Sequence, residues 1–141
     1  MNGKRREATA AILLAQDGRL LLQQRDTVPG ILHPGKVGLF GGHREGNESF
    51  LECIVREVYE EIGCRLPACR FEHLATRAGD DPDVPGGVVH GEIFVARNVP
   101  LEQLIVSEGT LLLMQPASIP KIAHKLVPSA HVALQCFGFR L

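Results

Sequence analysis

The sequence lacks the features that identify several large classes of protein. No apolar run is long enough to span a bilayer, so no membrane segment is expected. The 15 basic residues are balanced by 16 acidic residues, and the absence of a positive surplus argues against nucleic acid as the partner. The four cysteines lack the paired spacing of a metal site, which favours reduced thiols in a cytoplasmic protein.

Length and composition favour a single folded domain over residues 1–141. A chain of 141 residues can bury a sizeable core, and a hydrophobic content of 45% is typical of a globular protein. The sequence contains no internal repeat, low-complexity segment or interdomain linker. A single core is therefore expected.

The distribution of apolar and turn residues predicts an α+β domain, with a mixed sheet between helices. Asp17-Gly18 is a strong hairpin signal between the first two apolar segments. We expect loops at 26–36 and 79–87, an irregular segment at 100–107, and a short helix at 116–124. Segment 128–137 fits a helix or a strand. The predicted strands are 8–15, 19–25, 37–40, 70–77, 88–96 and 111–115.

A helix with clear boundaries is predicted between Ser49 and Gly63. Ser49 and Glu52 have the spacing of a capping box, while Gly63 and then Pro67 supply a stop. At about 100° per residue, one apolar stripe is expected to face the core, and its members are Leu51, Ile54, Val55, Val58 and Ile62.

Three glutamates, Glu57, Glu60 and Glu61, share a different face of this helix. They are three and four residues apart, so their carboxylates are neighbours and repel one another, although Arg56 can pair with Glu60 one turn on. One interpretation is a solvated acidic face. The other is a site for Mg²⁺, which prefers carboxylate and water oxygens. The three glutamates alone do not decide between them.

The wider spacing resembles the Nudix box of the Nudix hydrolase family. The chain has every fixed position of that pattern between residues 42 and 63: Gly42, Glu48, Arg56, Glu57, Glu60, Glu61 and Gly63. It departs at the last position, where Cys64 replaces a larger aliphatic residue, and at Phe40, where many relatives have proline. A pattern with this many fixed positions is highly specific, and a weaker likeness extends over most of the chain.

The resemblance implies an α/β/α sandwich with a mixed β-sheet, and an enzyme that hydrolyses the pyrophosphate linkage of a small nucleotide. The substrate would be a nucleoside diphosphate linked to another group, such as a nucleoside triphosphate or a nucleoside diphosphate sugar. The cofactor would be Mg²⁺, with Mn²⁺ as an alternative. By the same resemblance, the metal ligands would be Glu57, Glu60, Glu61 and the carbonyl oxygen of Gly41, with Arg56 orienting a glutamate.

Glu108 lies outside the box, before Gly109. On composition alone it is an ordinary turn residue. The resemblance implies that its carboxylate reaches the metal site from a second side, to bind an ion or to accept a proton from the attacking water. For Glu48 we favour a role in fixing the loop before the helix over a role at the metal.

Other polar groups carry weaker signals. We interpret Arg25 as a surface residue rather than a phosphate ligand, and the Asp80, Asp81 and Asp83 cluster as a flexible acidic surface loop, because it lacks the calcium-loop pattern. Three phenylalanines are expected in the core, Phe71, Phe94 and Phe139. Four histidines have no ligand spacing and are interpreted as structural or exposed: His33, His43, His90 and His131.

Two alternative functions remain open. One is a nucleotide or metabolite sensor of the same fold without turnover, against which the intact glutamates argue. The other is an RNA 5′-end pyrophosphohydrolase, against which the charge balance argues. The attached group is not determined, because residues 128–131 read Pro-Ser-Ala-His and lack the asparagine found in relatives that prefer oxidised guanine. The oligomeric state is also undetermined, and a homodimer is compatible with the sequence.

Overall fold

The computed structural model describes residues 5–31 and 33–141. Residue 32, within the loop expected at 26–36, therefore lies outside the described part. The elements in chain order are β1 (Arg5–Ala15), β2 (Leu20–Gln24), β3 (Val37–Gly38), β4 (Phe40–His43), α1 (Phe50–Ile62), η1 (Ala68–Arg70), β5 (Phe71–Asp80), β6 (Val88–Val99), η2 (Leu101–Gln103), β7 (Thr110–Met114), η3 (Pro116–Lys125) and α2 (Pro128–Phe137). No helix among the described residues is both long and apolar enough to cross a membrane.

All of the strands belong to one mixed sheet. Its main path runs β3-β2-β1-β6-β5, while β4 also pairs with β1 and β7 also pairs with β2. The central pair, β1 and β6, is parallel, and the other pairs are antiparallel. The predicted mixed sheet is therefore confirmed.

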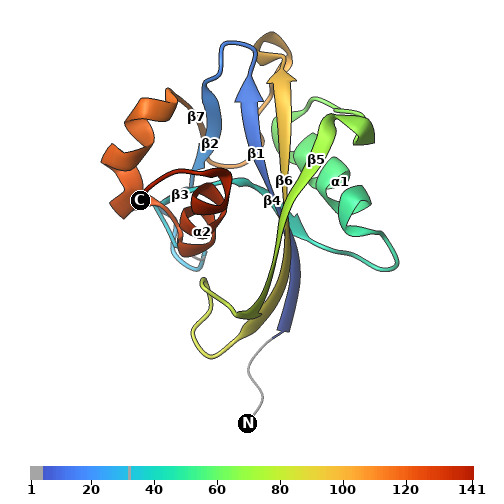
Figure 1. Ribbon diagram of the computed structural model, residues 1–141, viewed down its shortest axis with the longest axis vertical. Coiled ribbons are helices and arrows are strands. Elements are labelled where there is room, and N and C mark those ends of the chain that lie inside the picture. The colour runs from blue at the N-terminus through green and yellow to red at the C-terminus, as the bar shows by residue number, and fades with distance from the viewer. Residues whose placement is uncertain (1–4, 32) are drawn as a thin grey trace.

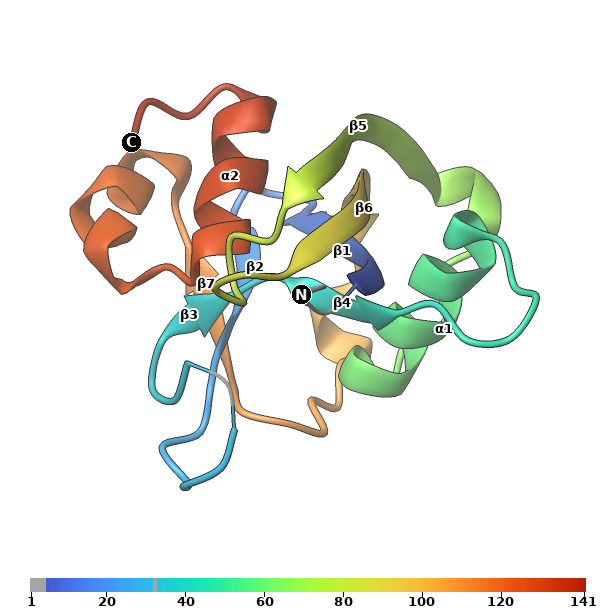
Figure 2. The same cartoon turned by 90° about the horizontal axis from the view of Figure 1, so that it is seen from below.

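Helices cover both faces of the sheet, as Figures 1 and 2 show. Helix α1 packs on one face, while α2 and η3 lie on the other. The side chains of successive β1 residues point to opposite faces of the sheet, so Leu13 lies in the core beneath α1 and Ile12 in the core beneath α2. The arrangement agrees with the α/β/α sandwich that the sequence resemblance implied.

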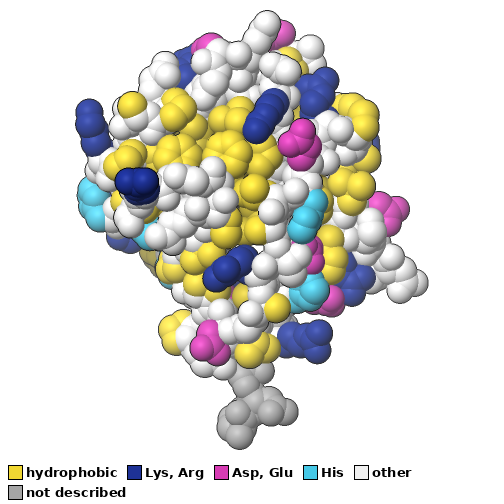
Figure 3. All heavy atoms as spheres, in the orientation of Figure 1, with side chains coloured by type: hydrophobic (Ala, Val, Ile, Leu, Met, Phe, Trp, Pro, Cys, Tyr) yellow, Lys and Arg dark blue, Asp and Glu magenta, His cyan; other side chains and the backbone are white. Residues whose placement is uncertain are grey.

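The α2 face is less completely covered than the α1 face. Leu74, Phe137 and Phe139 are only partly buried around the core beneath α2. Figure 3 shows hydrophobic side chains gathered on this side of the molecule, over α2 and the strands beside it. Phe71 and Phe94 are buried in the core beneath α1, as predicted, whereas Phe139 lies at the edge of the other core.

Several predicted boundaries change because pairing partners are distant in sequence. The strand expected at 37–40 is two strands, since β3 pairs with β2 whereas β4 pairs with β1. Segment 128–137, left open as helix or strand, is the helix α2, which has Pro128 in its first turn and ends at Gly138 with φ 114°. The short helix predicted at 116–124 is a 3₁₀ helix with Pro120 inside it.

The predicted apolar stripe of α1 is wrong at one position. Leu51 is 37% exposed, whereas Cys53 is completely buried. The first turn of α1 packs on β1 and β4 through Cys53, whose sulfur lies 3.4 Å from Thr9 Oγ1. Leu51 therefore faces away from the sheet, while Ile54, Val58 and Ile62 are buried as predicted. All four cysteines are free thiols.

The predicted acidic surface loop is also wrong. Residue 80 ends β5, and Asp81 and Asp83 are only 6% and 8% exposed. Arg6 of β1 is the reason, because its Nε lies 2.6 Å from Asp81 Oδ2 and its Nη2 lies 3.6 Å from Asp83 Oδ2. This pairing holds the pKa of Asp81 below its ordinary value. Ion pairing thus replaces hydration for both carboxylates.

Candidate active site

Helix α1 is held at both ends, which positions its carboxylates. The predicted capping box is present: Glu52 N donates to Ser49 Oγ at 3.0 Å, and Ser49 N donates to Glu52 Oε1 at 2.7 Å. At the other end Gly63 has φ 70° and donates its N–H to Tyr59 O. The helix therefore begins and ends where the sequence predicts.

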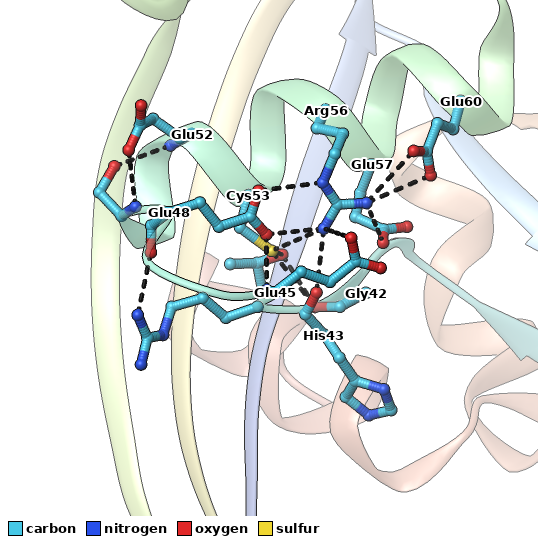
Figure 4. Close-up of polar contacts among 12 residues, drawn as sticks. Gly42, His43, Glu45, Glu48, Glu52, Cys53, Arg56, Glu57 and Glu60 are labelled. Carbon is cyan, nitrogen blue, oxygen red and sulfur yellow. Dashed lines mark hydrogen bonds and ion pairs between the residues drawn. The ribbon is translucent and has the colours of Figure 1, made fainter.

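Arg56 is the centre of a network of carboxylates and loop carbonyls (Figure 4). Its Nη2 donates to Glu48 Oε1 at 2.7 Å and to His43 O at 3.1 Å. Its Nη1 donates to Glu57 Oε1 at 2.9 Å and lies 3.3 Å from the carboxylate oxygens of Glu60. The hydrogen bonds to Glu48 and then to the other carboxylates raise the pKa of Arg56.

Glu48 ties this network to the loop before the helix. Besides its contacts with Arg56, its Oε1 accepts a hydrogen bond from Glu45 N at 2.8 Å. The bond from Arg56 lowers the pKa of Glu48 to about 2. These contacts agree with the interpretation of Glu48 as a residue that fixes the loop, because the side chain is fully engaged by the guanidinium and the loop backbone.

Glu61 lies apart from Arg56, against strand β4. Its Oε1 accepts a hydrogen bond from Gly41 N at 2.8 Å. Burial raises the pKa of Glu61 to about 8, and the negative charges of Glu57, Glu108 and Glu60 act in the same direction against the opposing bond from Gly41. A cation beside this carboxyl group would favour its charged form.

Glu57 lies beside Glu61 and against the next residue of β4. Burial also raises the pKa of Glu57, against the opposing effect of Arg56. A Cβ atom added to Gly42 would overlap the Glu57 carboxylate, whereas a Cβ added to Gly41 would overlap the backbone oxygen of Thr9. The absence of a side chain at Gly42 thus leaves room for the Glu57 carboxylate, and its absence at Gly41 leaves room for the backbone of strand β1.

These two glycines predict opposite effects of the same substitution. Gly41→Ala is expected to destabilise the fold by about 3 kcal/mol, because φ 152° and the approach of β1 both exclude a side chain. Gly42→Ala is expected to keep the fold, since only the flexible end of Glu57 must move, but to lower kcat/KM about a hundredfold by displacing that carboxylate. Urea unfolding and steady-state kinetics of both variants measure this. A fully active, folded Gly42→Ala enzyme would contradict it.

A loop distant in sequence completes the C-terminal end of α1. Ile105 N donates to Ile62 O at 2.8 Å, Ser107 N donates to Glu61 O at 3.1 Å, and Ser107 Oγ bonds Glu60 O at 3.0 Å. These bonds satisfy helix carbonyls that have no partner within the helix. Sequence reasoning missed this contact, because it joins residues 47 positions apart.

The same loop brings Glu108 to the box carboxylates. Gln23 Nε2 donates to Glu108 O at 3.0 Å, which fixes its backbone beside β2. Gly109, with φ 65°, passes so close to Gln24 O that a Cβ atom would overlap it. Glu108 is near enough to Glu61 for its charge to raise that residue's pKa.

The side chains as they stand are paired with protein groups rather than gathered around a common point. Over 5–31 and 33–141, no group of three or more histidine, cysteine, aspartate or glutamate side chains is arranged to hold a metal ion. The reason is visible in the contacts, because Glu57 and Glu60 turn to Arg56 while Glu61 turns to the Gly41 N–H. The donor set, half-buried and exposed carboxylate oxygens from neighbouring glutamates, is nonetheless suited to Mg²⁺ or Mn²⁺.

A cavity of about 350 Å³ lies on the α2 face and reaches the same part of β4. Gly41 and Gly42 form one end of it, and the walls include β1, β6 and the first turns of α2. Arg25, interpreted from the sequence as a surface residue, also lines this cavity. A ligand in the cavity would therefore meet β4 where Glu57 and Glu61 approach from the other face.

The histidines contribute to structure in different ways. His90 stacks on Phe50 and lies 2.5 Å from Glu92, while His33 lies 3.3 Å from the backbone oxygen of Asp83. His43 lines the cavity and is 3.3 Å from Arg6 Nη1. The interpretation of these residues as structural agrees with the contacts of His33 and His90.

Comparisons with known proteins agree with this architecture. The family model described as NUDIX domain matches residues 4–110. A search of curated proteins found no match. A MutT protein from Methanosarcina mazei is similar in structure, with TM-score 0.77 and 20% identity over 97% of this chain and 95% of the other.

Two further solved structures are similar over most of this chain. The Escherichia coli ORF135 protein has TM-score 0.72 and 25% identity, covering 96% of this chain and 89% of the other. A bifunctional NMN adenylyltransferase/ADP ribose pyrophosphatase from Francisella tularensis, complexed with AMP and a manganese ion, has TM-score 0.71 and 16% identity over 94% of this chain and 41% of the other. With the domain match and the complete box on α1, the chain belongs to the Nudix family and is a Nudix pyrophosphohydrolase.

Proposed function

We propose that this protein hydrolyses the pyrophosphate linkage of a small nucleotide in a reaction that depends on Mg²⁺ or Mn²⁺. The observation that carries the proposal is the half-buried Glu61 carboxylate, which is bonded to Gly41 of the strand that borders the cavity and has Glu57, Glu60 and Glu108 near it. Phosphoanhydride oxygens are anionic and repel a nucleophile, so such a reaction needs positive charge at the site. The carboxylates provide the place for it.

Glu57, Glu60 and Glu61 would hold the cation, with the Gly41 carbonyl and Glu108 as additional oxygen donors. When bound, the cation neutralises phosphate oxygens and lowers the pKa of a coordinated water. Arg56 bonds Glu57 through Oε1, so Glu57 Oε2 could bind the ion without breaking that contact, whereas both oxygens of Glu60 lie 3.3 Å from Arg56 Nη1 and at least one would turn to the ion. Arg56 keeps its two-point contact with Glu48, so it remains in place to orient Glu57.

The group attached to the pyrophosphate would occupy the cavity on the α2 face. Its volume of about 350 Å³ is near the lower end of the range of small-molecule sites, roughly 300–1,000 Å³, which suits one nucleoside. Its walls are mainly apolar, with Ala8 and Ala10 on the sheet, Val127 just before α2 and Ala130 on α2. The AMP and manganese in the Francisella tularensis complex support a nucleotide and a divalent cation as the ligands.

A substrate panel tests this proposal directly. The purified protein is mixed with Mg²⁺ or Mn²⁺ and with nucleoside triphosphates, nucleoside diphosphate sugars, ADP-ribose and 5′-triphosphorylated RNA. Released phosphate, pyrophosphate and nucleoside monophosphate are measured, and binding is measured by calorimetry. We expect metal-dependent release of a nucleoside monophosphate from at least one of them. Tight binding without turnover would instead identify a sensor, and turnover confined to 5′-triphosphorylated RNA would identify an RNA-end hydrolase.

Glu108 supplies a prediction about catalysis from outside the box. Glu108→Gln is expected to lower kcat far more than it raises KM, because the carboxylate acts from the loop on the water or the metal while the cavity is unchanged. Stabilisation by Mg²⁺ should remain, since the three helix glutamates are intact. If this variant keeps wild-type turnover across about pH 6 to 9, Glu108 is only a turn residue. The general base would then be one of the glutamates on α1.

A further inference from the structure

The turn between β5 and β6 is built around two carboxylates with different partners. Asp81 accepts hydrogen bonds from both Nε and Nη2 of Arg6, at 2.6 and 2.8 Å, and the Asp81 side chain is completely buried. Asp83 lies two residues on, and its N–H donates to Asp81 Oδ1 at 2.9 Å. Asp81 thus organises the turn, and the turn presents Asp83.

Asp83 reaches across to the first turn of α2. The N-cap residue of this helix is Val127, which has no polar side chain to bond the first-turn amides. Ser129 N donates instead to Asp83 Oδ1 at 2.9 Å. A carboxylate from another element therefore caps α2 and complements the positive end of its dipole. Figure 2 shows this turn beside the start of α2.

The start of α2 is held at two points. Val127 N donates to Val37 O of β3 at 2.8 Å, and Ser129 N bonds Asp83. His33, from the loop before β3, also meets this turn, with Nε2 3.3 Å from Asp83 O. Asp83, His33 and Ser129 all line the cavity, and they come from three different segments of the chain.

We propose that Asp83 is a positioning residue that sets the width of the cavity on the α2 face, and through it the affinity for the nucleoside part of the substrate. The proposal rests on the proposed function, because it assigns that cavity to the nucleoside. The hydrogen bond to Ser129 holds the α2 wall at a fixed distance from the sheet. Without it, the wall is in place only part of the time, and apparent affinity falls by that fraction.

A different explanation is that Asp83 acts only as a counter-ion of Arg6, whose Nη2 is 3.6 Å from Asp83 Oδ2. Asp83→Asn separates the two, because the amide keeps an oxygen acceptor for Ser129 N–H but loses the charge. Asp83→Ala removes both. Asp81→Asn is the matched control, since it weakens a buried contact with the same arginine while its amide oxygen can still accept the Asp83 N–H that shapes the turn.

The probes are the 5′-monophosphates of adenosine, guanosine, cytidine and uridine, titrated calorimetrically in Mg²⁺ into the wild type and the three variants. For the monophosphate that binds the wild type most tightly, Asp83→Ala is expected to weaken binding about tenfold, as for a wall in place a tenth of the time. Asp83→Asn should stay within about threefold. Asp81→Asn should lower the melting temperature but leave binding within about twofold, because the amide still accepts the Asp83 N–H and the turn keeps its shape.

Two further measurements separate positioning from simple destabilisation. Amide hydrogen exchange at Ser129 should accelerate in Asp83→Ala and not in Asp81→Asn. With a turned-over substrate, Asp83→Ala should raise KM with little change in kcat, since the carboxylates on the α1 face are untouched. If Asp83→Ala fails to fold, the binding data for Asp83→Asn and the hydrogen-exchange data still test the proposal.

The outcomes are distinct from those of the substrate panel. Equal loss of binding in Asp83→Asn and Asp83→Ala would overturn the proposal, because it would show that affinity depends on the charge of Asp83. An equal loss of binding in Asp81→Asn would also overturn it, because it would show that affinity depends only on the stability of the turn. Monophosphate binding that depends on Asp83 without any turnover would uphold the proposal while refuting hydrolysis. Turnover by a protein whose monophosphate binding does not depend on Asp83 would refute this proposal while supporting hydrolysis.

Discussion

Glu60→Gln is expected to lower kcat about a thousandfold, equivalent to roughly 4 kcal/mol of barrier, while leaving the fold intact. The Glu60 side chain is 54% exposed, and its side-chain partner is Arg56. Arg56 also bonds Glu48, Glu57 and the His43 carbonyl, so it stays ordered without Glu60. The amide keeps the shape of the side chain but loses the charge that would bind the cation.

The measurement is steady-state turnover of the substrate identified by the panel, with melting temperature recorded for the same samples. Glu52→Gln is the matched control on the same helix, because glutamine also completes a capping box. Full activity of Glu60→Gln, or full activity of the wild type in EDTA, would remove Glu60 and the metal from the mechanism.

A large gain in stability is expected from a change at Glu61. Its pKa is raised from an ordinary 4.5 to about 8 in the folded protein, chiefly by burial. The folded state therefore holds a proton that the unfolded state releases between these values, and stability falls as pH rises from 4.5 to 8. Glu61→Gln removes this penalty while its amide oxygen can still accept the Gly41 N–H.

In EDTA, Glu61→Gln should be more stable than the wild type by on the order of 3 kcal/mol at about pH 9. At about pH 4 the two proteins should have nearly equal stability, because Glu61 is then protonated in both states. Urea unfolding at the two pH values measures the difference, with the exposed Glu72→Gln as control. Parallel pH curves for the wild type and Glu61→Gln would show that Glu61 has an ordinary pKa.

Metal addition should offset most of the stability that the wild type lacks relative to Glu61→Gln. Mg²⁺ or Mn²⁺ at about 100 times its dissociation constant stabilises a protein by roughly 2.7 kcal/mol, and we expect the wild type to gain stability in this way. The double variant Glu57→Gln/Glu61→Gln should gain much less, because its two buried ligands have lost their charge. Equal gains in both proteins would place the ions elsewhere.

Features encoded by neighbouring residues could be predicted from the sequence. Ser49 and Glu52 bond each other within one helical turn, and Gly63 closes the same helix, so local spacing was enough to define α1. The box spacing placed Arg56 among its carboxylates for the same reason. The failed assignment of Leu51 shows the limit, because an ideal helical stripe does not say which part of the helix extends past the sheet.

Features that join distant residues could not be read from spacing. Arg6 and Asp81 are 75 positions apart, so an acidic turn was mistaken for a hydrated loop. The Gly41 N–H was missed as a partner of Glu61 because it depends on where β4 passes the helix. The Ser129 amide had no visible partner until the fold brought Asp83 to it.

The carboxylates and the cavity lie on opposite sides of strand β4, and this separation has a consequence for how the protein can diversify. The ionisable cluster lies on the α1 face, whereas Ala8, Ile93 and Ala130 shape the cavity on the α2 face. One strand, carrying Gly41 and Gly42, is the boundary between them. Under the proposed function, mutations on the cavity side would alter which molecules are accepted and leave the carboxylates of the chemical step unchanged, so a lineage could take new substrates while its reaction stays the same.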